Sequence, residues 1–169
     1  RNEIVGVAGL VGSGREDLID TIYGLSKPHS GTLKIDGVAQ KFHAPADAVS
    51  AGIALVPRDR RHDGLVLDMS VSDNINLAAL DAVSNWSLES RRAANTVATD
   101  MSETLDIRPR NIAATSRLLS GGNQQKVALA KWLAAKPGVL MLDEPTRGVD
   151  IGAKQEIYGL MEDLAAMVP

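Results

Sequence analysis

The most constraining feature of the sequence is an apolar run that ends in two adjacent carboxylates. Residues Val139–Leu142 are all apolar, and Asp143 and Glu144 follow them directly. A short continuous apolar run of this kind is typical of a parallel strand that is buried on both faces. Acids at the C-terminal tip of such a strand can hold Mg²⁺ and orient an attacking water in phosphoryl transfer. The run therefore favours an α/β fold with chemistry at this edge of the sheet.

A second polar motif precedes this strand by one short predicted helix. Residues Leu119–Lys126 read Leu-Ser-Gly-Gly-Asn-Gln-Gln-Lys, and Ser120 stands where it can cap a helix that begins with Gly121 and Gly122. The bare amides of the two glycines then lie at the positive end of the helix dipole, which is a favourable place for a phosphate. We call Leu119–Lys126 the signature loop.

Size and charge limit the function classes. With 169 residues the chain is expected to be a single domain with a proper core, and its formal net charge of -3 argues against a nucleic-acid footprint. No apolar run has the length of a membrane span, and the first residues do not resemble a signal peptide. The absence of cysteine fits a reducing compartment. We expect a soluble cytoplasmic domain that meets a membrane through a partner.

A glycine-rich loop follows the first predicted strand, Glu3–Ala8. Gly9 and Gly14 have the spacing of a Walker A motif, which wraps phosphates between a strand and a helix. The motif's Lys and hydroxyl are replaced by Arg15 and Glu16. A Glu carboxylate at ~4 Å from a phosphate charge costs roughly 4 kcal/mol at an effective dielectric near 20. From these residues alone, a degraded nucleotide loop and a glycine turn that binds nothing are both open.

The remaining elements follow from local signals. We predict a helix over 15–23, a hairpin over 32–42 around Asp36-Gly37, a short helix from Pro45 to Gly52 and a buried strand over 53–56. Further helices are predicted from Ser70, from Asn85 with a core stripe of Ala93, Val97, Met101 and Leu105, over 124–135, and from Ile151. The charged stretch 57–64 between them is expected to be a solvated loop, and His62 a solvated side chain rather than a metal ligand.

The motifs together resemble the ATP-binding-cassette ATPases. Four segments carry a narrower resemblance to the second, C-terminal cassette of bacterial sugar importers of the ribose/galactose/xylose class: Gly9–Arg15, Val56–Arg60, Leu119–Lys126 and Thr146–Lys154. The resemblance implies a P-loop α/β core with a small antiparallel hairpin and an inserted helical subdomain. It divides the chain into three parts: a nucleotide-binding core over 1–66, a helical subdomain over 67–118, and the signature loop, Walker B strand, D-loop and final helix over 119–169. The core contains the Walker A motif and the Q-loop region at the charged stretch 57–64, where Arg58 stands in place of the nucleotide-sensing Gln. It also implies that outer strands are missing at both ends.

The resemblance assigns roles to individual residues. ATP is the implied ligand, with Mg²⁺ held through water by Asp143. Glu144 is the implied catalytic carboxylate, which would orient or deprotonate the attacking water. The implied nucleotide contacts are Gly9, Gly12, Ser13, Gly14, Arg15, Glu16, Leu119, Ser120, Gly121, Gly122, Gln124 and Asp150. The implied partners are an N-terminal cassette, the transmembrane permease subunits and, indirectly, a periplasmic sugar-binding protein, with no nucleic acid. The implied location is the cytoplasmic face of the bacterial inner membrane.

Two residues depart from the family pattern in the local nucleotide site. The resembled cassettes commonly have Arg at the position of Arg15, but more often Thr and Glu at the positions of Glu16 and Arg58. We therefore expect an impaired site in this chain, while its signature loop completes the site of the partner cassette. The alternative is a non-hydrolysing cassette that only docks on its partner. A cassette of DNA repair or chromosome structure would need long coiled-coil heptads, which the sequence lacks.

Overall fold

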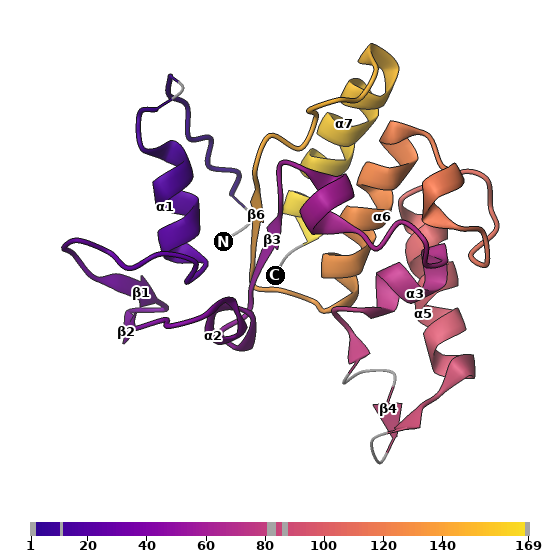
Figure 1. Cartoon of the computed structure of the whole chain (residues 1–169), viewed down its shortest axis with the longest axis horizontal. Helices are drawn as coiled ribbons and strands as arrows, with labels where there is room; N and C mark the ends of the chain where they lie inside the picture. Colours follow the sequence, from indigo (N-terminus) through magenta and orange to yellow (C-terminus); the bar gives the residue numbers. More distant parts are fainter. Residues whose placement is uncertain (1–2, 11, 81–83, 86–87, 168–169) are drawn as a thin grey trace.

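The structure is a computed structural model that describes residues 3–10, 12–80, 84–85 and 88–167 (Figure 1). The helices are α1 (Arg15–Ile22), α2 (Pro45–Ser50), α3 (Val71–Asn76), α5 (Arg91–Thr104), α6 (Gly121–Ala134) and α7 (Ile151–Met167), with single turns η1 (Arg60–Gly64) and η2 (Ser116–Leu118). The strands are β1 (Leu33–Ile35), β2 (Val38–Gln40), β3 (Ile53–Val56), β4 (Ser84–Asn85), β5 (Leu88–Glu89) and β6 (Val139–Leu142).

A parallel pair of strands lies at the centre of the molecule. Ile53 pairs with Val139 and Val56 with Leu142, so β3 and β6 end at the same edge. Every residue of β3 is buried, as predicted. Strand β6 is only half-buried and leaves Val139 47% exposed, because β3 is its one partner strand in the described residues. The expectation of a fully buried β6 was therefore wrong for its outer side.

Helices cover the two sides of this pair unequally (Figure 1). On one side, α3, α5, α6 and α7 pack around the larger hydrophobic cluster, in which α6 is the central helix. On the other side lie α1, α2 and the β1–β2 hairpin, with a smaller cluster built on Tyr23, Ala48, Ile53 and Leu55. The sheet edge that carries Asp143 thus lies between a small lobe that contains α1 and a large helical lobe.

Short-range signals gave correct elements at three places. The turn of the β1–β2 hairpin has positive φ at Asp36 and Gly37, as a type I′ turn requires. Ser70 caps α3 by accepting a hydrogen bond from the amide of Asp73 at 3.0 Å. Ser120 caps α6 in the same way, so α6 begins at Gly121 as the predicted cap requires, and the range 124–135 predicted from the apolar pattern began too late.

Two predicted elements were wrong. Residues 3–8 form no strand and are exposed, since none of their backbone groups pairs with a strand in the described part of the chain. The helix predicted from Asn85 begins six residues later, at Arg91, with Ser90 as its cap. Residues 84–85 and 88–89 pair as an antiparallel hairpin instead, so the inserted subdomain is not all-helical. Trp86 and Ser87 lie outside the described residues.

The buried face of α5 is rotated by one residue from the predicted stripe. Within the helix Ala94, Ala98 and Ser102 are buried, whereas of the predicted stripe Leu105 is buried and Val97 and Met101 are half-buried against the larger cluster. Small side chains on the buried face let α5 lie close to α3, which the predicted stripe did not anticipate. Among the described residues, no helix is both long and apolar enough to cross a bilayer.

Candidate functional site

The glycine-rich loop leads into α1 through two residues with left-handed backbone. Gly12 has φ 81° and Gly14 has φ 87°, a region that side chains with Cβ rarely occupy. A Cβ on Gly9 would collide with Oγ of Ser13, whose amide donates to the carbonyl of Leu10 at 3.0 Å. The sequence therefore makes a narrow turn at the N-terminus of an eight-residue helix, where the free amides favour an anion.

The first arginine of α1 is tied to the tip of β6. Nη2 of Arg15 donates to Oε1 of Glu144 at 2.6 Å and lies 3.8 Å from Oε1 of Glu16. The hydrogen bond from Arg15 lowers the pKa of Glu144, and the charges of Arg58, Arg15 and Arg147 act in the same direction. Glu144 is thus held as a carboxylate that already accepts from a guanidinium.

The residue after Pro57 links the same acids. Nη2 of Arg58 donates to Oε1 of Glu16 at 2.7 Å, and its Nε lies 3.4 Å from Oδ2 of Asp143 and 3.6 Å from Oε2 of Glu144. The hydrogen bond to Glu16 raises the pKa of Arg58 further. Five charged side chains therefore meet where α1, β3 and β6 converge. We call these residues the charged cluster: Arg15, Glu16, Arg58, Asp143 and Glu144.

The charged stretch after β3 is not the fully solvated loop that was expected. Arg60 is only 6% exposed, and it donates from Nη1 to the carbonyl of Arg147 at 2.8 Å and from Nη2 to that of Gly148 at 3.1 Å. Burial lowers its pKa. His62, by contrast, is exposed as expected, and its contact with Asp63 raises its pKa. Arg60 thus joins the segment after β3 to the segment after β6.

The signature loop lies apart from the charged cluster. Ser120 is exposed, and its Oγ accepts from the amide of Asn123 at 3.4 Å and from Nδ2 of the same residue at 3.0 Å. A Cβ on Gly121 would come within 2.7 Å of Nη2 of Arg60, and one on Gly122 within 2.7 Å of Cβ of Ala153. Close packing against Arg60 and Ala153 therefore favours glycine at both positions, independently of any role in binding phosphate.

Three further predicted contact residues have internal partners. Leu119 is buried in the larger cluster. Gln124 is 1% exposed, donates to the carbonyl of Ser116 at 3.2 Å and accepts from Nε of Arg61 at 3.1 Å. The carboxylate of Asp150 is exposed and accepts from the amide of Ala153 at 2.9 Å, which is the contact of a helix cap for α7. Leu119 and Gln124 therefore support the signature loop by packing and hydrogen bonding within the protein.

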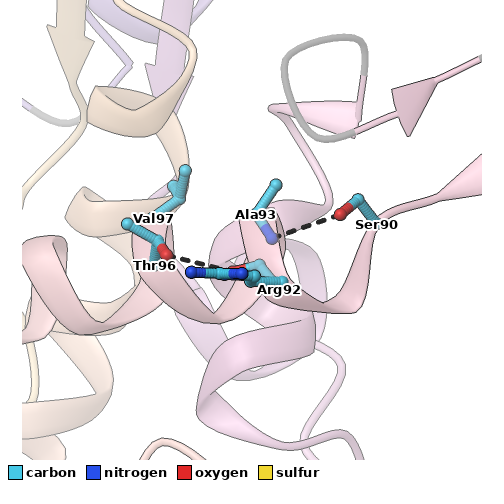
Figure 2. A pocket seen from close by; sticks show the side chains of 5 residues that line it. All are labelled: Ser90, Arg92, Ala93, Thr96 and Val97. Carbon is cyan, nitrogen blue, oxygen red and sulfur yellow. Dashed lines mark hydrogen bonds between the residues drawn. The ribbon is translucent and has the colours of Figure 1, made fainter.

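An open hollow of about 400 Å³ lies far along the chain from these motifs (Figure 2). Its lining side chains all belong to α5 or to its cap: Ser90, Arg92, Ala93, Thr96 and Val97. Figure 2 shows the hydrogen bonds among them, from the amide of Ala93 to Ser90 and from Thr96 to the carbonyl of Arg92. The hollow is a surface feature of a single helix, and none of the predicted site residues lines it.

Comparison with known proteins identifies the family. The ABC transporter family model matches residues 1–147, which include the glycine-rich loop, the signature loop and the acids after β6. The chain belongs to the ABC transporter family. This ABC transporter chain is 46% identical over 163 residues to the ribose import ATP-binding protein RbsA of Shouchella clausii. It is 47% identical over 163 residues to the protein of the same name from Lactococcus lactis subsp. cremoris. Each match covers 96% of this chain and 33% of the relative, so the chain spans about a third of their length.

Solved structures share the fold of this ABC transporter chain. A nucleotide-free ATP-binding cassette from an ABC transporter superposes with a TM-score of 0.77 at 20% identity, over 93% of this chain and 64% of that one. The cbiO1 protein of Clostridium perfringens gives 0.76 at 24% identity, over 95% and 61%. The predicted fold class, a P-loop cassette core with a small antiparallel hairpin, is confirmed.

The residues of this ABC transporter chain fit a phosphate better than a metal ion. The left-handed glycines and the helix N-terminus form a turn that a Cβ at Gly9 would obstruct. The carboxylates expected near Mg²⁺ are instead paired with Arg15 and Arg58. In the described residues, no three acidic or imidazole side chains are placed to share a metal ion. The loop therefore has the geometry of a phosphate-binding turn, whereas Asp143, the expected magnesium ligand, has a carboxylate oxygen 3.4 Å from Nε of Arg58.

Proposed function

We propose that this chain is an ATP-binding cassette of a subunit that powers carbohydrate import, and that it is the second cassette of a two-cassette polypeptide. The identity of 46–47% to ribose import ATP-binding proteins supports this assignment, together with the motifs quoted above. The chain would act peripherally, at the cytoplasmic face of the membrane. Its partners would be the first cassette, the permease subunits and, through them, a periplasmic sugar-binding protein.

In this proposal the chain's own nucleotide site hydrolyses ATP poorly. The observation that carries it is the 2.6 Å contact between Arg15 and Glu144. A carboxylate whose pKa is lowered by a guanidinium is a weaker general base for the attacking water. The phosphates can still bind at the glycine-rich loop, where the backbone of Gly12 and Gly14 shapes the turn. ATP, when bound, would supply the phosphoryl group, and Glu144 would have to leave Arg15 to orient water.

The signature loop is proposed to act on the nucleotide of the partner cassette. The placement of Ser120 supports this idea, because it is exposed, caps an intact helix and makes no contact with the charged cluster in the described residues. The first amides of α6 have no helical acceptor and lie at the positive end of the dipole. They are therefore available to phosphates that this chain does not itself hold.

ATP hydrolysis by the complete two-cassette protein tests the asymmetry. We expect Ser120→Arg to abolish most turnover, because it places a bulky cation at the signature loop, and Arg15→Ala to leave most of it. Ser90→Arg is the matched control, since it removes an equivalent helix cap from α5. Loss of turnover in Arg15→Ala together with normal turnover in Ser120→Arg would overturn the proposal.

The second candidate function is a non-hydrolysing regulatory or interaction cassette that keeps the fold only to dock on its partner. The charged cluster favours it, because every acid of the predicted catalytic edge is already paired with an arginine. Titration of the chain with a fluorescent ATP analogue separates the two candidates. Saturable binding supports a nucleotide cassette, whereas no binding alongside normal association with the first cassette supports the docking role.

A further inference from the structure

The guanidinium of Arg58 lies among the carboxylates at which the sequence predicts a divalent ion. Arg58 has carboxylate oxygens of three residues within 4 Å, at 2.7 Å from Glu16, 3.4 Å from Asp143 and 3.6 Å from Glu144. These acids come from α1 and from the tip of β6, which are the two sides of the glycine-rich loop's site. Carboxylates that converge in this way are the usual ligands of Mg²⁺. Here a side chain of the protein supplies the positive charge.

Arg58 also retains hydrogen-bonding capacity toward an anion. Its Nε is buried and has no hydrogen-bond acceptor of good geometry in the described residues, although Asp143 lies 3.4 Å away. A buried N–H without an acceptor is costly, and a planar guanidinium is well suited to phosphate oxygens. The Nε–H of Arg58 therefore lacks the kind of acceptor that a phosphate oxygen could supply.

The presence of Glu16 and that of Arg58 are linked by the ion pair that the two residues form. Both differ from the residues that the resemblance leads us to expect in the local nucleotide site, and they form the shortest contact that Arg58 makes, 2.7 Å. Glu16 alone would repel a phosphate chain, and Arg58 alone would repel a divalent ion. As a pair they are neutral, so the two departures form one coupled replacement rather than two separate defects.

We propose that Arg58 takes the place of the divalent cation in this site, so that the chain binds nucleotide phosphates independently of magnesium. The proposal rests on the proposed function in one respect, namely that the glycine-rich loop holds a nucleotide. Glu16, Asp143 and Glu144 keep the guanidinium in position, and Arg15 balances the third carboxylate. A single positive charge of the protein, rather than the two of a bound Mg²⁺, would here be permanent.

Binding of a fluorescent ATP analogue, measured in excess Mg²⁺ and in excess EDTA, tests the proposal on the 169-residue chain. We expect the two dissociation constants to agree within about threefold, and Arg58→Gln to weaken binding in EDTA roughly tenfold by loss of a charged hydrogen bond. Arg117→Gln is the matched control, because Arg117 forms a separate surface ion pair with Asp68. Binding that requires Mg²⁺ would overturn the proposal and leave the proposed function intact.

A measurement without nucleotide keeps the proposal testable when no analogue binds or a variant fails to fold. Mn²⁺ is titrated into the wild-type chain, and its binding is followed by water proton relaxation. We expect the same weak response as in the Glu16→Gln/Asp143→Asn double variant, because the carboxylates are already occupied by Arg58. Tighter Mn²⁺ binding by the wild type than by the double variant would show a cation site at the cluster and refute the inference. Absence of analogue binding in both buffers, with the Mn²⁺ response as expected, would instead count against the proposed function.

Discussion

The backbone at Glu144 is held in an unusual conformation. Its φ of 46° lies in the left-handed region, which costs a non-glycine residue of order 1–3 kcal/mol. Hydrogen bonds fix the chain on both sides, from the amide of Asp143 to the carbonyl of Val56 at 3.0 Å and from the amide of Arg147 to that of Glu144 at 2.9 Å. The backbone therefore fixes the direction of the Glu144 side chain, which accepts a hydrogen bond from Arg15.

The lowered pKa of Glu144 predicts an acid-dependent loss of stability. Its pKa in the folded chain lies below the ordinary value of 4.5, so the unfolded chain binds the proton more readily. The stabilisation is complete above pH 4.5 and is lost as the pH falls through the folded pKa. We expect Glu144→Gln to lower the melting temperature at pH 7 and to differ less from the wild type at pH values below 4.5, as followed by circular dichroism.

Glu103→Gln is the control for this measurement. Glu103 is exposed on α5 and forms no ion pair in the described ranges, so its replacement should change stability little at either pH. A melting-temperature difference for Glu144→Gln that is constant from neutral to acid pH would show that the Arg15 contact does not control the titration.

Single residues were predictable when their partners are close in sequence. Ser70, Ser120 and the Asp36-Gly37 turn act within a few positions, and the structure confirms each of them. Arg15 and Glu144 are 129 positions apart, and Arg60 and Arg147 are 87 apart. No local pattern encodes such pairs, so the charged cluster could be predicted as a set of acids at a strand tip but not as a paired network.

At the scale of elements, the start of α6 is packed directly against the start of α7. Gly122 is buried, and the missing Cβ leaves room for the Cβ of Ala153. Glycine normally weakens a helix interior by about 1 kcal/mol relative to alanine. Its presence here allows the two helices to approach, so the signature loop and the segment before α7 share one packed contact.

Gly122→Ala is therefore expected to destabilise the chain, although alanine is the better helix former. The new Cβ would lie 2.7 Å from Cβ of Ala153, and overpacking of this kind costs about 1–3 kcal/mol. Ala153→Gly should recover part of the loss in the double variant. Urea denaturation gives both values.

Gly159→Ala in α7 provides the contrasting control. In the described chain nothing lies within 4 Å of the position that the new methyl group would take, so helix propensity alone should act, and a gain of about 1 kcal/mol is expected. Equal stability changes for Gly122→Ala and Gly159→Ala would mean that the α6–α7 contact does not constrain the signature loop.

Elements were predictable from periodicity only where their partners are present. The apolar runs of β3 and β6 pair as expected. Residues 3–8 have the same composition but lack a neighbouring strand in the described chain, and without ladder hydrogen bonds they form no strand. The hairpin of β4 and β5 is too short to give a periodic signal, which explains the misplaced start of α5.

At the scale of the whole molecule, Trp132 on α6 joins the two lobes. It packs against both hydrophobic clusters, and its ring meets that of Tyr23 edge-on at 6.4 Å. Nζ of Lys131 lies 5.1 Å from the ring centre. The small lobe therefore depends on a residue of the large one.

Trp132→Ala should uncouple the lobes as well as destabilise them. Loss of the ring costs about 3 kcal/mol by comparison with other aromatic truncations, and the urea transition should become shallower as the small lobe unfolds first. Trp132→Phe should cost about 1 kcal/mol, because it keeps an aromatic ring and removes an Nε1 that is buried without a partner in the described residues. A steep single transition in Trp132→Ala, followed by circular dichroism, would show that other contacts couple the lobes.

The buried Arg60 has a consequence for the connectivity of the fold. Strand β3 pairs with β6, and Arg60 donates hydrogen bonds to the carbonyls of Arg147 and Gly148. The segment from β3 to Arg60 and the segment from β6 to Gly148 are therefore joined at both ends. Because both ends of these two segments are joined, the number of residues in each is constrained by the other. We expect an inserted or deleted residue between β6 and Arg147 to break either the pairing of β3 with β6 or the two hydrogen bonds of Arg60.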